Sequence, residues 1–236
     1  MVDVHCHMLF GVDDGPSQVE ESVQMLIEAK NQGVDQVILT PHYREGMFSY
    51  PVDQILKNYK HLREQAEWFG VQLYLGSEYH VDGNMVEHIA SRRCQSLAQG
   101  PYVLAEFSHG TEFDYMRDAV RNLMMAGYIP VVAHAERYAA LAKNMDNIKT
   151  LKAEGACILL NASSILGNEG KELKRYTGKI LEKGLADLVA SDAHGIKHRK
   201  CHLKECFEFV SKKYGAAYAS RLMETNPKMI IAHEQK

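Results

Sequence analysis

Short apolar runs alternate along the chain with longer segments of helical period, and this alternation limits the possible folds more than any other feature of the sequence. Runs that are apolar on both faces are typical of strands in a buried parallel sheet. Seven of them are found, at residues 2–4, 36–40, 71–75, 102–105, 129–133, 157–160 and 187–190. Strands that alternate with helices in this way predict an α/β fold, either a closed or nearly closed (β/α) barrel or an open doubly wound sheet.

Helix start and stop signals occur between the apolar runs. Ser17 and Glu20 have the spacing of a capping box, and Gly33 suits the end of the helix that would follow them. Further helices are predicted immediately before glycines, at residues 51–69, 112–126, 169–183 and 201–214. No low-complexity linker, charge block or internal repeat divides the sequence, so we expect a single domain over residues 1–236.

Composition and charge narrow the class of protein. A hydrophobic content of 46% and a charged content of 24% are ordinary for a soluble globular chain, and a net charge of −3 gives no basic footprint for nucleic acid or an anionic membrane. No stretch approaches the ~20 consecutive apolar residues of a membrane span, and the first residues lack the features of a signal peptide. We therefore expect a cytoplasmic protein that neither binds nucleic acid nor inserts into a membrane.

The sulfur chemistry of the chain is limited. Its five cysteines are scattered, odd in number and without a C-x-x-C pair. Neither a disulfide framework nor a cysteine-based zinc site is therefore expected. Histidine is the residue type that stands out, with twelve in 236 residues, several of them beside carboxylates.

Metal-ligand side chains are concentrated where the predicted strands end. Six of the seven runs lead at their carboxyl end to a histidine, an aspartate or a glutamate, and one more acid lies in the loop after the first run. The nine residues are His5, His7, Asp14, His42, Glu78, Glu106, His134, Asp192 and His194. In (β/α) barrels the face formed by the carboxyl ends of the strands holds the active site, so we expect these side chains to meet there.

The set as a whole predicts a metal site, although a single histidine at a strand end is most often a satisfied core or rim residue. His5 and His7 are two residues apart, so an extended strand points both imidazoles to the same side, and Asp192 and His194 repeat this geometry. Gathering carboxylates and imidazoles on one rim is costly without positive charge to balance them. One zinc ion takes about four ligands, and mixed imidazole and carboxylate ligands favour manganese, iron or zinc. A multinuclear site is the expectation.

The segments that carry these residues resemble a known family. His5-Cys6-His7 matches the opening H-x-H signature of the PHP (polymerase and histidinol phosphatase) superfamily. The closer resemblance is to the manganese-dependent protein-tyrosine phosphatases of Gram-positive capsule and exopolysaccharide clusters. It is carried in order by residues 2–7, 11–15, 40–42 with 46–48, 76–78, 102–107, 133–138 and 190–194, and extends to about Arg199.

The resemblance implies a distorted, TIM-like (β/α)7 barrel of the PHP fold with three metal ions per chain, Mn²⁺ first, with iron or zinc in some sites as the alternative. On the family pattern one ion is held by His5, His7, Glu78 and Asp192, a second by Glu78, Glu106 and His134, and a third by Asp14, His42 and His194. The two arginines that bind phosphate in the family fall on Arg137 and Arg199.

The activity that the resemblance implies is hydrolysis of phosphotyrosine, with the tail of a cognate bacterial tyrosine autokinase as substrate and the control of capsular or exopolysaccharide synthesis as the role. A metal-activated water would attack phosphorus directly, and the arginines would stabilise the phosphate oxygens. Two alternatives stay open: a small-molecule phosphatase such as a histidinol-phosphate phosphatase, and a metal-bound regulatory module without turnover.

A cysteine-based phosphatase is excluded by spacing. Such enzymes place an arginine six positions after the nucleophilic cysteine, and here those five positions hold Val12, Gly100, Ser163, Phe207 and Lys212. Cys6 is instead expected to be a small core residue whose side chain points away from the histidines on either side of it.

Several residues keep two interpretations at this stage. Arg137 could form an ion pair with Glu136, and Arg199 could simply be solvated in a basic loop. Arg44 is a third candidate for substrate contact. His80 departs from the apolar or small residue usual in the family, and Ala135 departs from the frequent proline; neither removes a ligand. Asn161 either lines the site or caps a helix or turn.

Overall fold

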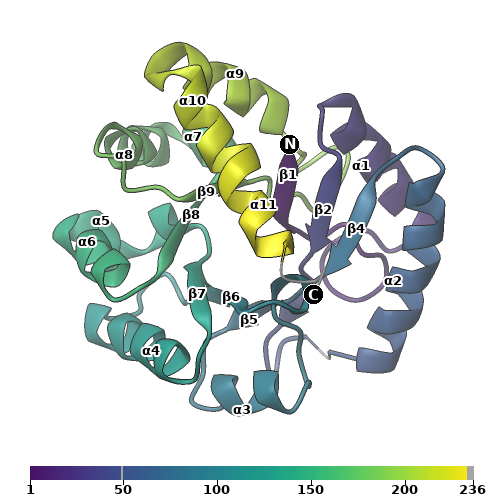
Figure 1. Ribbon diagram of the computed structural model, residues 1–236, viewed down its shortest axis with the longest axis horizontal. Helices are drawn as coiled ribbons and strands as arrows, with labels where there is room; N and C mark the ends of the chain where they lie inside the picture. The colour runs from purple at the N-terminus through teal and green to yellow at the C-terminus, as the bar shows by residue number, and fades with distance from the viewer. Residues whose placement is uncertain (49, 233–236) are drawn as a thin grey trace.

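Nine parallel strand segments curl around a buried interior in the computed structural model, which describes residues 1–48 and 50–232 (Figure 1). They are β1 (Val2–Cys6), β2 (Gln36–Leu39), β3 (His42–Tyr43), β4 (Gln72–Leu75), β5 (Glu78–His80), β6 (Tyr102–Glu106), β7 (Ile129–Val132), β8 (Cys157–Asn161) and β9 (Leu188–Ala190). One sheet has the order β1-β2-β4 and the other the order β3-β5-β6-β7-β8-β9. All seven predicted strands are found, and two of them continue into a second short strand.

The breaks within two of the chain passes have a local cause. Pro41 lies between β2 and β3 and cannot donate a backbone hydrogen bond to a ladder, and Gly76 with Ser77 separates β4 from β5. A Cβ at Gly76 would lie 2.8 Å from the Leu97 side chain and 3.2 Å from that of Ile38, so a larger residue would force these side chains to shift. Both breaks redirect the chain just before a predicted site residue, His42 in one case and Glu78 in the other.

The first and last strands approach each other at the carboxyl end of the sheet. Cys6 and Ala193 form an isolated parallel bridge, in which the His7 N–H donates to the Ala193 carbonyl at 2.8 Å. The Asp192 N–H donates to the His5 carbonyl at 2.9 Å. The architecture is thus a mixed α/β fold with a curled parallel sheet.

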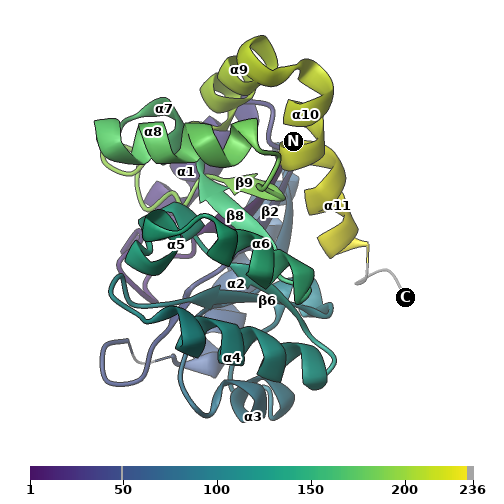
Figure 2. The same ribbon diagram turned by 90° about the vertical axis from the view of Figure 1, so that its left-hand side faces the viewer.

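Helices cover the outside of the curled sheet, as Figures 1 and 2 show. The α-helices are α1 (Val19–Asn31), α2 (Val52–Glu67), α3 (Met85–Ala90), α4 (Phe113–Met125), α5 (Ala139–Lys143), α6 (Asp146–Ala153), α7 (Ala162–Leu166), α8 (Lys171–Glu182), α9 (Leu203–Tyr214), α10 (Ala216–Ser220) and α11 (Asn226–Ile231). Short turns of other helix types are η1 (Leu97–Gln99), η2 (Ala135–Arg137) and η3 (Arg221–Thr225). None of the helices in the described part of the chain is both long and apolar enough to span a membrane.

The five predicted helices are present, with two corrections at their starts. The capping box is wrong: α1 begins at Val19 after Gln18, and no side chain caps it in the described structure. The helix predicted from residue 169 begins at Lys171, because Gly170 before it has a φ of 110°, which is not helical. The remaining helices were not predicted, since segments of five to eight residues are too short to show helical periodicity.

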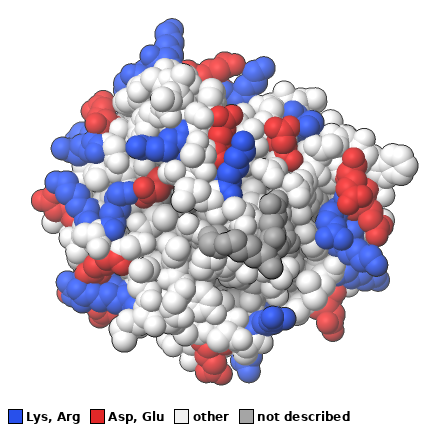
Figure 3. All heavy atoms as spheres, in the orientation of Figure 1, with Lys and Arg blue, Asp and Glu red and all other residues white. Residues whose placement is uncertain are grey.

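Two buried hydrophobic layers result from this arrangement. The interior layer lies inside the curl and includes Val2, Val4, Ile38 and Leu104; Ile230 of α11 belongs to it as well. A larger layer lies between the strands and the surrounding helices. On the face shown in Figure 3, charged side chains of both signs are spread around the periphery without a large patch of one sign.

Candidate metal centre

The nine ligand-type residues meet at the carboxyl end of the strands. Eight of them lie on a strand or within four residues after one, and Asp14 lies in the loop between β1 and α1. Asp14 is about half exposed, whereas His5, Glu78 and Asp192 are buried. The structure therefore brings the whole predicted set together, from segments that are up to 189 residues apart in the sequence (His5 to His194).

A register irregularity in β1 positions the first two histidines. Asp3 pairs with Val37 but Cys6 pairs with Leu39, so β1 contains one residue more than β2 between these two pairs. An extra residue of this kind reverses the alternation of side chains along a strand. Val4 belongs to the interior layer, yet the Cys6 side chain lies in the outer layer with its Sγ 3.6 Å from the Ile38 carbonyl. Cys6 thus points away from the cluster, as predicted.

The donor atoms form three overlapping groups, and within each group all the atoms lie within 4.8 Å of one another. They are His7 with Asp14, His42 and His194; His5 with His7 and Asp192; and His42 with Glu78 and Glu106. The first contains the predicted third set, the second most of the first set, and the third two members of the second set. His134, the remaining member, has its Nε2 at 2.8 Å from Glu78 Oε1 and 3.9 Å from Glu106 Oε1.

Glu78 occupies the middle of the cluster. Its Oε2 is 3.2 Å from His5 Nε2, 3.1 Å from His7 Nε2 and 3.1 Å from His42 Nδ1, while its Oε1 faces His134. A carboxylate shared between two ions would need this central position. Burial alone would raise the pKa of Glu78, but the charge of His5 and the hydrogen bonds from His134, His5 and His7 outweigh it and hold the pKa well below its ordinary value.

The donor geometry fits metal ions better than it fits hydrogen bonding. His5 Nε2 and His7 Nε2 face each other at 3.3 Å, with carboxylate oxygens on both sides. Within the described residues, His42 Nδ1 and His194 Nε2 make no hydrogen bond, although a carboxylate oxygen lies 3.1 Å and 3.3 Å away respectively. Buried imidazole nitrogens left without a partner are costly, and coordination to a cation removes that cost.

Asp13 supports the cluster and was missed by the sequence analysis. Its Oδ2 lies 2.8 Å from His7 Nδ1 and accepts the His42 backbone N–H at 3.1 Å, and its Oδ1 accepts the Gly15 N–H at 3.0 Å. A carboxylate on the far nitrogen of a ligating histidine fixes the ring and its tautomer. Burial would lower the pKa of His7, but Asp13 and Glu78 outweigh it and raise that pKa well above its usual value. The sequence analysis assigned Asp14 to the ligand set and gave its neighbour Asp13 no role.

Other neighbours hold single members of the cluster. Tyr138 has its hydroxyl 3.2 Å from His134 Nδ1. Asn161 donates from Nδ2 to Asp192 Oδ2 at 2.7 Å, so it lines the site rather than capping a helix through its side chain. His80, on β5, places Nδ1 at 2.9 Å from Glu106 Oε2. The Glu106 carboxylate is thereby held on one oxygen while the other faces His134.

The backbone is strained at three positions of the site. His134, Asp192 and Arg199 have φ values of 30°, 51° and 47°, in the left-handed region that residues with a side chain rarely adopt. Such conformations cost roughly 1–3 kcal/mol each and persist where the surrounding structure imposes them. Their gathering at one site suggests that the positions of these three side chains matter more than local stability.

Both predicted phosphate-binding arginines lie beside the cluster and converge on Asp192. Arg137 Nη1 donates to Asp192 Oδ2 at 3.2 Å, and Arg199 Nη2 lies 3.0 Å from both Asp192 oxygens. The alternative pairing of Arg137 with Glu136 is not found, since Arg137 Nε and Nη2 bind Glu169 at 3.1 and 2.8 Å. Arg199 is anchored rather than freely solvated. A cavity of about 270 Å³ lies against both guanidinium groups.

Glu169 is a second residue that the sequence analysis missed. Its carboxylate receives Arg137 on one oxygen and the Ser163 hydroxyl on the other. The charge of Arg137 and these hydrogen bonds outweigh the effect of burial and lower the pKa of Glu169. No pattern in the Gly-Asn-Glu-Gly segment indicates this role, because the contact spans 32 residues and depends on tertiary structure.

The cysteines are poor nucleophiles. All five are free thiols, and burial is the main cause that raises the pKa of each. The pKa is raised to about 12 for Cys94 and to about 11 for Cys157. Thiols with such values stay protonated near neutral pH, which agrees with the absence of the cysteine–arginine spacing.

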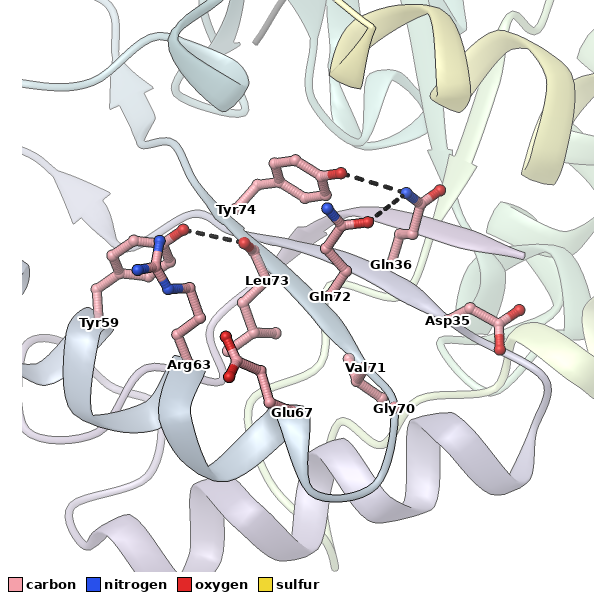
Figure 4. Close-up of a pocket in the computed structure, with 10 residues that line it drawn as sticks. All are labelled: Asp35, Gln36, Tyr59, Arg63, Glu67, Gly70, Val71, Gln72, Leu73 and Tyr74. Carbon is pink, nitrogen blue, oxygen red and sulfur yellow. Dashed lines mark hydrogen bonds between the residues drawn. The ribbon is translucent and has the colours of Figure 1, made fainter. Parts of the chain in front are cut away.

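A cavity of about 640 Å³ lies at the other end of the strands (Figure 4). It is lined by Tyr59, Arg63 and Glu67 of α2 and by the first residues of β2 and β4, which begin the two chain passes that reach His42 and Glu78. Gln36 Nε2 donates to Gln72 Oε1 at 3.0 Å within it. This cavity is separate from the cluster and contains none of the nine residues.

Comparison with known proteins places this geometry in a family. A family model described as capsular polysaccharide synthesis, CpsB/CapC, matches residues 1–232. The tyrosine-protein phosphatase CpsB of Streptococcus pneumoniae is 34% identical over 98% of each chain. The tyrosine-protein phosphatase YwqE of Bacillus subtilis is 30% identical over 99% of this chain and 92% of its own.

Solved structures agree with the sequence relatives. One match belongs to the crystal structures of YwqE from Bacillus subtilis and CpsB from Streptococcus pneumoniae, which are described as unique metal-dependent tyrosine phosphatases. It superposes on this chain with a TM-score of 0.92 at 29% identity and covers 99% of this chain and 95% of that chain. The phosphotriesterase homology protein from Escherichia coli shares the fold alone, with a TM-score of 0.62 at 14% identity and 97% of each chain covered. The chain belongs to the CpsB/CapC family of capsular polysaccharide synthesis proteins.

Proposed function

We propose that this chain is a metal-dependent protein-tyrosine phosphatase. The observation that carries the proposal is the cluster of nine ligand-type side chains with two arginines anchored beside it, in a chain whose relatives over nearly their whole length are named tyrosine-protein phosphatases. The buried thiols with raised pKa values favour metal-based over cysteine-based hydrolysis.

We propose the following ligands for three Mn²⁺ ions, with iron or zinc as alternatives in some sites. The first ion is held by His5, His7, Glu78 and Asp192, the second by Glu78, Glu106 and His134, and the third by Asp14, His42 and His194. The central position of Glu78 supports its place in two of the sets. Bound ions would supply Lewis-acid charge and lower the pKa of water toward neutrality.

The residues of the chain perform the remaining tasks. Arg137 and Arg199 approach the cluster from the same side, so their planar guanidinium forks can bind two phosphate oxygens each and stabilise the charge that develops on them. Glu169 and Asp192 keep these groups in place before substrate arrives. Tyrosine leaves as a phenolate of pKa ~10, so the demand for a general acid is modest.

The finer description of the fold is part of the same proposal. We propose that the curled sheet is a distorted (β/α)7 barrel and that residues 1–236 form one domain. Seven chain passes follow each other around the interior layer, and the bridge between Cys6 and Ala193 links the first to the last. The shared fold with the phosphotriesterase homology protein supports this description.

The proposed substrate is the phosphotyrosine tail of a cognate bacterial tyrosine autokinase, whose dephosphorylation regulates capsular or exopolysaccharide synthesis. The family model for capsular polysaccharide synthesis supports this role. We propose that this chain acts in the cytoplasm, where the ATP that an autokinase uses is found.

The decisive experiment measures phosphate release from a tyrosine-phosphorylated peptide by chelated protein before and after Mn²⁺ is restored. Activity should return with Mn²⁺ and be lost in His5→Ala and Arg137→Ala, while Arg175→Ala, an exposed change on α8, keeps it. His5→Ala should also lose bound metal, whereas Arg137→Ala should retain it. A reconstituted protein that binds metal tightly and hydrolyses histidinol phosphate but no phosphotyrosine would contradict the proposal.

A further inference from the structure

A pocket of about 210 Å³ opens beside the metal cluster and takes no part in the functions assigned so far. We call it the arginine pocket; its lining residues are Tyr43, Arg44, Glu45, Phe48, Tyr50, Val52 and Arg93. They come from β3, from the loop that leads into α2, and from the segment after α3. The pocket therefore joins two regions of the chain at the carboxyl end of the sheet.

The arginine pocket shares a wall with the metal cluster. The Phe48 ring stacks on the ring of His42, with centroids 4.8 Å apart and planes inclined by 9°. His42 in turn places Nδ1 at 3.1 Å from Glu78, in the middle of the cluster. A molecule bound at the cluster is thus separated from the pocket by little more than one aromatic ring.

The pocket walls are aromatic and fixed in place. Tyr43 lies between two other tyrosines, stacked on Tyr79 at 4.7 Å and tilted against Tyr50 at 5.2 Å. The Tyr50 hydroxyl is 2.6 Å from Ser77 Oγ, and the Tyr79 hydroxyl is 2.7 Å from His88 Nδ1. Rings held by hydrogen bonds and by neighbouring rings present a preformed surface, so little ordering free energy is lost when a ligand stacks on them.

Two cationic groups face this aromatic surface. Neither Arg44 nor Arg93 forms an ion pair or a side-chain hydrogen bond with any residue that the structure describes, in contrast to Arg137 and Arg199. One acid, Glu45, also lines the pocket, but it is 62% exposed and lies toward His88. The pocket therefore offers an excess of positive charge together with unused guanidinium donors.

We propose that the arginine pocket binds a second phosphotyrosine of the same substrate chain while the first lies at the metal cluster. The inference rests on the proposed function. Guanidinium forks bind phosphate bidentately, and aromatic walls contact a tyrosine ring through stacking. An aspartate or glutamate side chain would satisfy the arginines but leave the aromatic walls without a partner.

The test compares initial rates on peptides that are singly and doubly phosphorylated, with spacings of one to five residues between the tyrosines. Rates are expressed per phosphotyrosine, which removes the statistical factor of two. At the best spacing, kcat/KM for the doubly phosphorylated peptide should exceed that for the singly phosphorylated one about tenfold, mainly through KM, which is the gain expected from one charge-assisted contact of ~1.4 kcal/mol.

Variants of the two arginines identify the pocket. In Arg44→Gln and Arg93→Gln, the ratio of kcat/KM for the doubly phosphorylated peptide to that for the singly phosphorylated one should fall toward one. The matched control is Arg92→Asn, which removes the neighbouring charge outside the pocket and suits the left-handed backbone at this position, where φ is 58°. That control should keep the wild-type ratio. Because each variant is compared with itself on two peptides, a general loss of stability or turnover does not affect the result.

The possible outcomes separate this inference from the proposed function. Equal rates per phosphotyrosine at every spacing, by an enzyme that is active on phosphotyrosine, would overturn the inference and leave the function intact. A glutamate in place of the second phosphotyrosine that gives the same tenfold gain would overturn it as well. A reconstituted enzyme without activity on any phosphotyrosine peptide would refute both.

Discussion

The two ends of the same strands are built in opposite ways. At the carboxyl end, buried histidines and carboxylates face each other at distances near 3 Å, as for His5 and Glu78. At the amino end, the cavity of Figure 4 combines exposed charged side chains, such as Arg63 and Glu67, with neutral hydrogen-bonded pairs, such as Tyr59 with the Leu73 carbonyl at 2.9 Å. This sheet therefore gathers its buried charged side chains at one end and leaves the other end to stability, a division that (β/α) barrels also show.

The strongest test of the difference between the two ends is one substitution at each end, of Glu78 at the carboxyl end and of Gln72 at the amino end. Glu78→Gln should lower kcat/KM about 10³-fold, because it removes the charge of the proposed shared ligand. Gln72→Ala at the amino end should change kcat/KM less than about twofold, since it breaks one exposed neutral hydrogen bond. Bound metal is counted in parallel by elemental analysis. A Glu78→Gln protein with a full metal complement would contradict the central position assigned to Glu78.

The arginine anchor provides the next largest effect. Glu169→Gln should lower kcat/KM about tenfold, because Arg137 loses a charged partner but keeps its contact with Asp192. The effect should appear mainly in KM for phosphotyrosine, with bound metal unchanged. Glu172→Gln, an exposed change on α8, is the control. If Glu169→Gln loses metal instead, the residue supports the cluster rather than the arginine.

His80 sharpens the comparison within the carboxyl end itself. His80→Ala should weaken Mn²⁺ affinity about tenfold for one ion, because a histidine that holds a ligating carboxylate acts as its support. The measurement is calorimetric titration of chelated protein, with His61→Ala on the surface of α2 as the control. Equal affinities in the two variants would show that Glu106 does not need its partner.

The smallest effect is expected from the thiols. Alkylation of the folded protein should change activity less than about twofold, since the raised pKa values keep the cysteines protonated and four of the five are buried. Loss of activity in proportion to the alkylation of one cysteine would contradict this, provided that circular dichroism shows the fold intact.

The parts of the molecule that were predictable from sequence are those with a local signal. Strand positions follow from runs of apolar residues, and the nine ligand-type residues follow from their place at the ends of those runs. The contacts of Asp13 and Glu169 were not predictable, because they depend on segments brought together by folding. The irregularity of β1 was not predictable either. Val2 and Val4 occupy even positions of the sequence and His5 and His7 odd positions, which in a regular strand would face opposite sides. Only the pairing with β2 shows how both sets face inward.

This irregularity of β1 sets the electrical character of the site. Val4 belongs to the buried interior layer and its chain neighbour His5 to the cluster, so a single peptide unit separates hydrocarbon from charge. Hydrocarbon has a low dielectric constant and screens the charged side chains of the cluster only weakly. The interior layer therefore lies as a low-dielectric region behind the cluster. The electrostatic field of the cluster is directed toward the open rim, where an incoming phosphate would meet it.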